Sequence, residues 1–378
     1  MNPTLPVLIW PIPDHTMMNA LDFADPEAQP ILTEIQTYLN SFVSPIANRI
    51  DQQKTLLSES LQTLGNLGIF RLGVPKAQGG LGCDRRTLWH LSLQLAQTSG
   101  ALAFLVAQHQ SALGILLEHT EGNVAQTYLA DLVKGQVLIG VSFSHLRHNP
   151  VDLQAQPTSK GYRLQGMLPW LSGFQHMTMF VAAAPLPDQR ILFALMPFIN
   201  AQQASGGILH LSLPLPLAAV PSTQTVQAEV VNWLVPPEDV VGISGADWIA
   251  LRDRQQLLRS SAAPMGCARA SLQILAERAD AKNLYHHFRD RWHRLYDQIQ
   301  GELENLNPPY HAQLRAAAIH LAIQTSQAAL IASGGSALVL SHTVQRLYRE
   351  AMLYTVSGLN APLRHALMEG LLLEGHRH

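Results

Sequence analysis

The sequence predicts an α+β protein: a helical N-terminal domain, a middle antiparallel β-barrel or β-sandwich, and a C-terminal four-helix-type bundle. Apolar residues recur at helical spacing in the first third of the chain and in the last third. The middle third contains short alternating runs separated by Gly and Pro, and consecutive strands without intervening helices favour antiparallel pairing. The expected domains are 26–135, 136–245 and 246–378, after an irregular proline-containing leader over 1–25.

Composition indicates an oligomer that does not bind nucleic acid. The 378 residues are enough for several domains, and 47% are apolar while only 14% are charged, against about 25% charged in typical domains. So few charges favour burial of part of the surface in a homodimer or homotetramer. A net charge of −2, with no long basic run, predicts no nucleic-acid partner.

The two cysteines and the apolar runs bear on the compartment. Cys83 and Cys267 lie far apart and follow no ligand spacing, which favours reduced thiols in a cytoplasmic protein. The N-terminus has no basic segment of the kind that begins a signal peptide. Apolar runs such as 101–107 and 329–340 are too short to cross a bilayer, so no membrane span is expected.

The histidines indicate no metal site. Those that cluster in the sequence lack further ligands at metal-binding spacing. They are His286, His287, His293, His376 and His378. His109 lies in an apolar helical segment, where a hydrogen-bonded core histidine is a better interpretation than a catalytic one.

The helical segments follow from periodicity and breakers. Apolar residues recur every three to four positions over 31–42, 56–67 and 87–99. Glycines between 64 and 82 provide positive-φ turns and close helix contacts, and Val74-Pro75 forces an extended exit. The expected C-terminal helices, with a break at Pro308-Pro309, are 248–275, 285–304, 312–332, 344–356 and 362–373.

The middle segment predicts seven strands, and one strand end stands out. The strands are 137–143, 151–156, 162–167, 177–184, 191–196, 208–213 and 226–235. Gly166 is expected to end the third strand, so that Pro169 to Gly173 cap a strand pair. An indole at Trp170 could lie against an isoalloxazine ring while the Ser172 hydroxyl binds its polar edge. The alternative is that Trp170 plugs the end of a barrel.

Two segments resemble the acyl-CoA dehydrogenase superfamily. Leu61 to Gly140 resembles its N-terminal signature, and Gly166 to Gly173 is similar to its flavin-facing segment. The resemblance implies FAD as cofactor and an acyl thioester or similar apolar small molecule as substrate. It also implies that Ser142 contacts the pyrimidine edge of the flavin, and that Gly334-Gly335 approach the dinucleotide of a neighbouring subunit.

The chain departs from this family where the family has its catalytic carboxylate. The usual Glu position falls on Gly358, and the alternative position falls on Gln256, which cannot act as a base. Asp253, about one turn away, is a substitute candidate, so the catalytic residue stays unknown. Phe143 replaces a carboxylate beside Ser142, and the family's pyrophosphate clamp is not recognisable before Tyr296.

Three functions are compatible with these departures. The first is an FAD-dependent oxidoreductase of acyl-CoA dehydrogenase type with a displaced base. The second is a flavin-dependent monooxygenase on the same fold, which needs no base for an α-proton and could use FMN or a diffusible reduced flavin. The third is a non-catalytic scaffold that has lost flavin binding.

Overall fold

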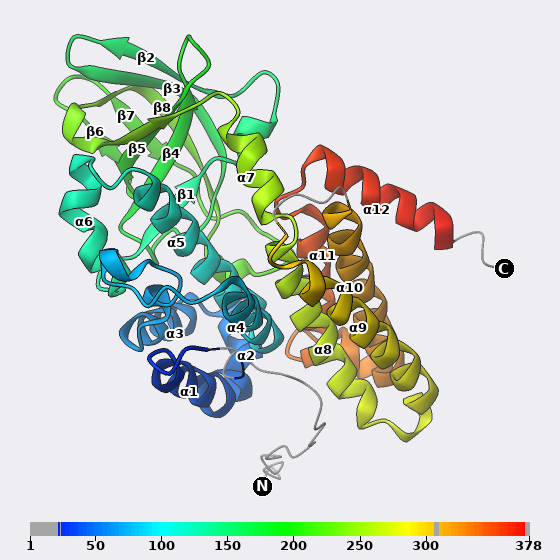
Figure 1. Cartoon of the computed structure of the whole chain (residues 1–378). Coiled ribbons are helices and arrows are strands. Elements are labelled where there is room, and N and C mark those ends of the chain that lie inside the picture. The colour runs from blue at the N-terminus through cyan, green and yellow to red at the C-terminus, as the bar shows by residue number, and fades with distance from the viewer. Residues whose placement is uncertain (1–21, 23, 306–309, 375–378) are drawn as a thin grey trace, which may run out of the picture.

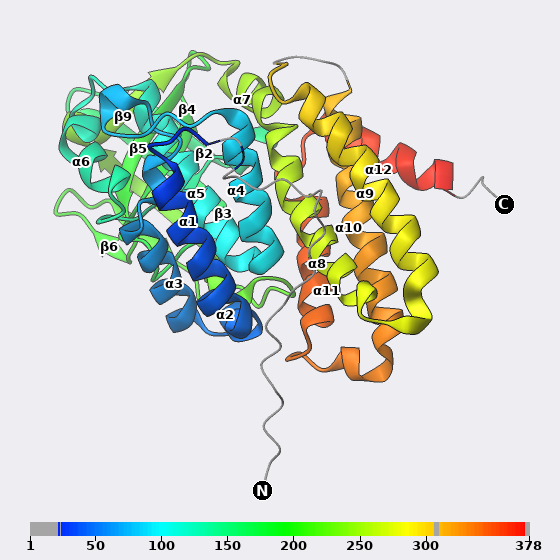
Figure 2. The ribbon, with the colours of Figure 1, turned by 60° about the horizontal axis from the view of Figure 1, so that its bottom comes forward.

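The computed structural model describes residue 22, residues 24–305 and residues 310–374. Most of the expected leader, the Pro308-Pro309 break and the histidines at 376 and 378 lie outside these residues. Within them, helices are followed by two β-sheets and then by further helices, so the predicted fold class is confirmed. The N-terminal helices lie below the sheets in Figure 1, and the C-terminal bundle stands beside them with α12 projecting from it. Figure 2 shows α1 to α3 on one side of α4 and the bundle on the other.

Two of the N-terminal helices begin at a side chain that accepts a hydrogen bond from a free N–H group of the first turn. The N-terminal helices are α1 (Gln29–Tyr38), α2 (Ala47–Gln52), α3 (Lys54–Asn66), α4 (Arg85–Thr98), α5 (Gly100–Glu118) and α6 (Asn123–Val133). The Asp84 side chain accepts a hydrogen bond from the Thr87 N–H at the start of α4, and Ser99 caps α5 in the same way. A Cβ on Gly135 would lie 2.6 Å from the Cα of Gly65, so the expected close helix contact is real.

Helix α5 is the most apolar helix of the described chain. By length and composition alone it could cross a membrane, but 56% of its apolar window is buried inside the protein. It packs against α4, α6 and strand β1. These contacts are those of a core helix.

The middle segment folds into two sheets. The strands are β1 (Ile139–Ser142), β2 (Leu153–Thr158), β3 (Gly161–Leu171), β4 (Met179–Pro185), β5 (Ile191–Pro197), β6 (Ala201–Gln202), β7 (Ile208–Leu211), β8 (Val226–Val235) and β9 (Val240–Ser244). One sheet has the order β1-β4-β5-β9 and the other β2-β3-β8-β7-β6. Pairing is antiparallel except between β1 and β4, which are parallel. The sequence missed β6 and β9, which are short and carry weak alternation.

The expectation that Gly166 ends its strand is wrong. Strand β3 continues to Leu171, and Gly166 takes φ +131° where the pairing with β8 shifts register. A Cβ at this position would lie 1.9 Å from the Asp152 carbonyl oxygen, so glycine permits a bulge inside the strand. Trp170 and Leu171 are therefore the last residues of β3, and the loop starts at Ser172.

The C-terminal helices are α7 (Trp248–Gln256), α8 (Ala262–Ala276), α9 (Lys282–Glu302), α10 (His311–Ser333), α11 (Thr343–Val356) and α12 (Ala361–Glu374). Helices α8 to α11 pack on one another as a four-helix bundle. The single helix expected over 248–275 is wrong, because a 3-10 turn, η9 (Arg259–Ser261), separates α7 from α8. In this turn the Ser261 hydroxyl donates to the Leu258 carbonyl. In a continuous helix this carbonyl would instead accept a backbone N–H.

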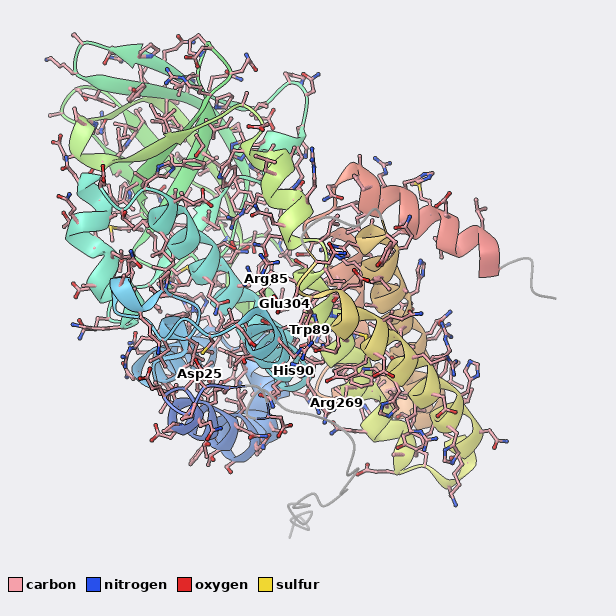
Figure 3. All side chains as sticks on the ribbon, in the orientation of Figure 1. Asp25, Arg85, Trp89, His90, Arg269 and Glu304 are labelled. Atoms are coloured by element: carbon pink, nitrogen blue, oxygen red, sulfur yellow. The ribbon has the colours of Figure 1, made fainter. Side chains whose placement is uncertain are left out.

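Two apolar cores share helix α4. Leu91 and Leu95 belong to the core of the N-terminal helices and sheets, whereas Trp89 and Leu93 belong to the core of the bundle. Figure 3 shows Trp89 and His90 between α4 and the bundle. The Trp89 indole N–H donates to the Ser261 hydroxyl at 3.1 Å, and His90 Nε2 lies 2.8 Å from the Tyr296 hydroxyl. The contact between α4 and the bundle is therefore both packed and hydrogen-bonded.

Candidate functional site

A cavity of about 1010 Å³ lies where the three parts of the chain meet. Its walls come from α4 and α5, the ends of β1 and β3, helices α7 and α8, and the loop that follows α11. Ligand-binding pockets usually measure roughly 300–1,000 Å³. The cavity is therefore large enough for a tricyclic ring together with a small substrate.

The predicted flavin-contact residues of the sheets lie together on the wall of the cavity formed by the ends of β1 and β3. The Trp170 side chain is 51% exposed and lines the cavity, which contradicts the alternative that it plugs a barrel. Ser142, at the end of β1, is buried, and its hydroxyl donates to the Trp170 carbonyl at 3.4 Å. The Ser172 hydroxyl lies 2.7 Å from that of Thr225. An indole face and two cavity-lining hydroxyls are thus brought side by side, in keeping with a docking surface for a flat polar-edged ring.

Phe143 occupies the position where the resembled family has a carboxylate, and it serves as an aromatic support. The Arg252 guanidinium lies 4.9 Å from the centre of the Phe143 ring and 5.2 Å from that of the Trp248 ring. Such cation–π contacts hold a guanidinium in place without an ion pair. No local pattern predicts this arrangement, because Phe143 and Trp248 lie more than a hundred residues apart.

The three candidate base positions all line the cavity. Gly358 adopts φ +60°, and a Cβ built there would lie 3.3 Å from Nη2 of Arg315. Gln256 supplies an amide. Asp253 accepts two hydrogen bonds from Arg147, at 2.6 and 2.9 Å, so each of its oxygens already has a donor. The structure therefore places no unengaged carboxylate at any of these three positions.

Glu118 is the other carboxylate among the described lining residues. It is the last residue of α5, and its Oε2 accepts the indole N–H of Trp248 at 2.9 Å. It was not a sequence candidate, since nothing in its surroundings in the chain marks it. Its place beside Trp248 and Arg252 gives it a role in holding the start of α7.

Arginines are the functional feature that sequence reasoning missed. Arg147, Arg252, Arg259 and Arg315 all line the cavity. Burial, together with the nearby Arg147 guanidinium, lowers the pKa of Arg315 to about 10. The seven-residue spacing of Arg252 and Arg259 across α7 and η9 was an available signal, because residues two turns apart share a helix face. Arg315, on α10, had no such signal.

Gly334 and Gly335 lie away from this cavity within one chain. They follow α10, Gly334 has φ +65°, and a Cβ on either glycine would meet no atom within 4 Å. The neighbouring Leu338 is 76% exposed. The structure does not bring these glycines to Trp170, and the resemblance assigns them to a neighbouring subunit's dinucleotide.

His109 is a core histidine. It is fully buried, its Nδ1 accepts the Ile139 N–H, and its Nε2 lies 3.1 Å from the Leu132 carbonyl oxygen, to which it donates. Burial lowers its pKa to about 4, so the ring is neutral at pH 7. The interpretation of His109 as a hydrogen-bonded core residue is confirmed.

Comparison with known proteins agrees with this geometry. Residues 25–136 match the family model described as "Acyl-CoA dehydrogenase, N-terminal domain". The very long-chain specific acyl-CoA dehydrogenase of Rattus norvegicus is 26% identical over 241 residues, which is 57% of this chain but only 36% of that relative. The chain thus spans about a third of the length of the curated relatives it matches first.

Solved structures share the fold over nearly the whole chain. The glutaryl-CoA dehydrogenase of Mycobacterium smegmatis has a TM-score of 0.77 at 15% identity, covering 94% of this chain and 96% of its own. An acyl-CoA dehydrogenase from Bacillus anthracis, complexed with FAD, has a TM-score of 0.76 at 14% identity, covering 95% of this chain and 70% of its own. Residues 25–136 therefore belong to the acyl-CoA dehydrogenase N-terminal domain family, and nearly the whole chain has the three-part fold of solved acyl-CoA dehydrogenases.

Proposed function

We propose that the protein is an FAD-dependent oxidoreductase that acts on an acyl thioester or a similar apolar small molecule without the usual catalytic Glu. The observation that carries the proposal is the half-exposed Trp170 indole beside Ser142 and Ser172 on the wall of the cavity. A flavin, when bound, supplies acceptance of a hydride. The FAD complex of the Bacillus anthracis relative supports the choice of cofactor.

The residues of this chain would bind and orient the reactants. Trp170 offers a flat apolar face, and the hydroxyls of Ser142 and Ser172 can bind the polar edge of the ring. Apolar residues of α5, among them Ala103 and Phe104, also line the cavity and suit an acyl chain. Because α4, α5 and α8 close the cavity from several sides, they would exclude water from the reacting atoms.

A monooxygenase on the same fold is the second candidate. It is favoured by one observation: neither Gly358 nor Gln256 supplies a carboxylate, and Asp253 is engaged by Arg147. A reaction that does not start with removal of an α-proton needs none of these groups. In that case the flavin would be a diffusible reduced FAD or FMN.

The exposed apolar segment after α10 supports a homo-oligomer. Leu338, Val339 and Leu340 are each more than half exposed, and Leu338 is three residues after Gly335. A second copy of the chain that covered them would bring these glycines against the neighbouring flavin site, as the family resemblance implies. Light scattering of the purified protein tests the dimer or tetramer. The cytoplasmic location stays a prediction; Cys83 and Cys267 are both free thiols.

The visible spectrum tests the function. Titration of the protein with FAD should shift the flavin absorption bands and quench Trp170 fluorescence. Anaerobic addition of hexanoyl-CoA should then bleach the flavin if the protein is a dehydrogenase, whereas oxygen uptake with reduced flavin and no bleaching would indicate the monooxygenase. Failure to bind FAD or FMN would reject both and leave the scaffold.

A further inference from the structure

The wall of the cavity carries more positive than negative charge. Its described lining residues include four arginines and two carboxylates, which are Arg147, Arg252, Arg259, Arg315, Glu118 and Asp253. Arg147 forms an ion pair with Asp253 at 2.6 Å, and Glu118 is bonded to the Trp248 indole. Within the described part of the chain, the other three guanidinium groups have no ion pair. A cavity of this kind attracts an anion.

Arg315 is the most constrained of these groups. Its side chain is only 7% exposed, and its Nη2 donates to the Ser357 carbonyl at 2.7 Å. Its Nε–H has no acceptor among the described residues. A buried charged donor without an acceptor is strongly unfavourable, so an anionic acceptor in the cavity would stabilise it. With a pKa lowered to about 10 by burial, the group still carries its charge at pH 7.

Arg259 and Arg252 complete the basic wall. The turn η9, which begins at Arg259, packs against α10, which carries Arg315. Burial is the main cause of the lowered pKa of Arg252; the charge of Arg259 lowers it further, and that of Glu118 opposes the shift. Two like charges that share a wall repel each other, and an anion between them would remove that repulsion.

We propose that this end of the cavity binds a carboxylate group of the ligand, with the Arg315 guanidinium as its donor. A carboxylate accepts charge-assisted hydrogen bonds from a guanidinium, and the Nε–H of Arg315 has no acceptor among the described residues. Of the two substrate classes in the proposed function, this favours a small molecule that ends in a carboxylate over an acyl thioester, with its apolar tail among the apolar side chains of α5.

The position of Arg315 indicates which end of the ligand carries the negative charge. A Cβ at Gly358, where the resembled enzymes hold their base, would lie 3.3 Å from the Arg315 guanidinium. The carboxylate would therefore sit at the reacting end of the ligand. That the bound anion is the substrate rests on the proposed function. That an anion binds at Arg315 does not depend on it.

Calorimetric titration with hexanoate and hexanamide tests the proposal. The two probes have nearly the same shape, but only hexanoate is charged at pH 7. Using the full-length protein without added flavin, we expect hexanoate to bind at least tenfold more tightly than hexanamide. Arg315→Gln should reduce hexanoate affinity roughly tenfold or more, the usual scale of a charge-assisted hydrogen bond, and leave hexanamide unchanged.

Two further variants and one further anion make the test decisive. Arg259→Gln removes a second positive charge from the cavity wall and should weaken hexanoate binding, though less than Arg315→Gln does. Because Arg259 is exposed, this variant should fold even if Arg315→Gln does not. Arg254→Gln, on the exposed face of α7 outside the cavity, is the matched control and should bind both probes like the unchanged protein. Equal affinity for hexanoate and hexanamide would overturn the proposal, as would stronger binding of inorganic phosphate than of hexanoate. The titrations contain no flavin. A protein that failed to bind FAD would therefore contradict the proposed function without affecting the hexanoate result.

Discussion

At the scale of single residues, the site depends on the Trp170 indole. It lies at the end of β3 with half of its surface exposed to the cavity. Trp170→Ala should weaken FAD binding by about 1 kcal/mol, or roughly fivefold, because aromatic stacking contributes on this scale beyond area burial. Fluorescence titration with FAD measures the change. Trp170→Phe keeps an aromatic face and should retain most of the affinity; equal binding by all three proteins would show that the ring docks elsewhere.

The ion pair of Arg147 and Asp253 is a residue-scale feature of stability. Both side chains are less than a fifth exposed, at 17% and 15%. Asp253→Asn leaves the Arg147 guanidinium without its partner, and we expect it to lower the free energy of unfolding by about 3 kcal/mol. Urea denaturation measures this loss. Asp290→Asn removes the exposed ion pair with Arg289 and should change the same quantity by less than about 1 kcal/mol.

At the scale of elements, the bulge at Gly166 lies inside β3, four residues before Trp170. Gly166→Ala would force a Cβ to within 1.9 Å of the Asp152 carbonyl at φ +131°, so strands β2 and β3 must separate locally. We expect a loss of more than about 2 kcal/mol in unfolding free energy together with weaker FAD binding. Gly206→Ala is the control: its φ is +88°, but no atom lies within 4 Å of the added Cβ. It should cost about 1 kcal/mol and leave FAD binding unchanged.

The same strand shows how far the sequence could predict the structure. Alternation along β3 and β8 was local and located both strands, and the glycines between 64 and 82 predicted the helix contacts. A bulge and a strand end look alike in a sequence, because both use glycine at positive φ. The parallel pairing of β1 with β4 depends on contacts between distant segments, which no local pattern encodes.

The candidate site was predictable only in part, for the same reason. Trp170 and Ser172 lie two residues apart in the chain, and Ser142 came from a family resemblance, so these residues could be found in advance. The interaction of Arg315 with the Ser357 carbonyl joins helices α10 and α11 across the bundle. Its consequence for Gly358 becomes visible only once the fold is known.

At the scale of the whole molecule, buried neutral histidines predict a pH dependence of stability. Burial lowers the pKa of His109 and of His145 to about 4, from an ordinary value near 6.5. Below pH 6.5 the unfolded chain takes up protons that the folded chain does not accept until about pH 4. The stabilisation is therefore complete above pH 6.5 and is lost as the pH falls, by about 3 kcal/mol for each histidine.

Urea denaturation between pH 7 and pH 4 measures this effect. His109→Gln keeps one donor and one acceptor but cannot be protonated in this range. Its unfolding free energy should fall less steeply with decreasing pH than that of the unchanged protein. Parallel curves for the two proteins would contradict the assignment of His109 as a proton-linked group.

Helix α4 gives one side to each of the two cores, with Leu91 and Leu95 on one and Trp89 and Leu93 on the other. Detaching the bundle would expose the Trp89 indole to water. It would also leave one side of α4 without packing partners. The two halves should consequently melt as one cooperative unit, with a single calorimetric transition whose van't Hoff and measured enthalpies agree. A ligand wedged into the cavity at this junction would touch both halves at once and raise the temperature of that common transition.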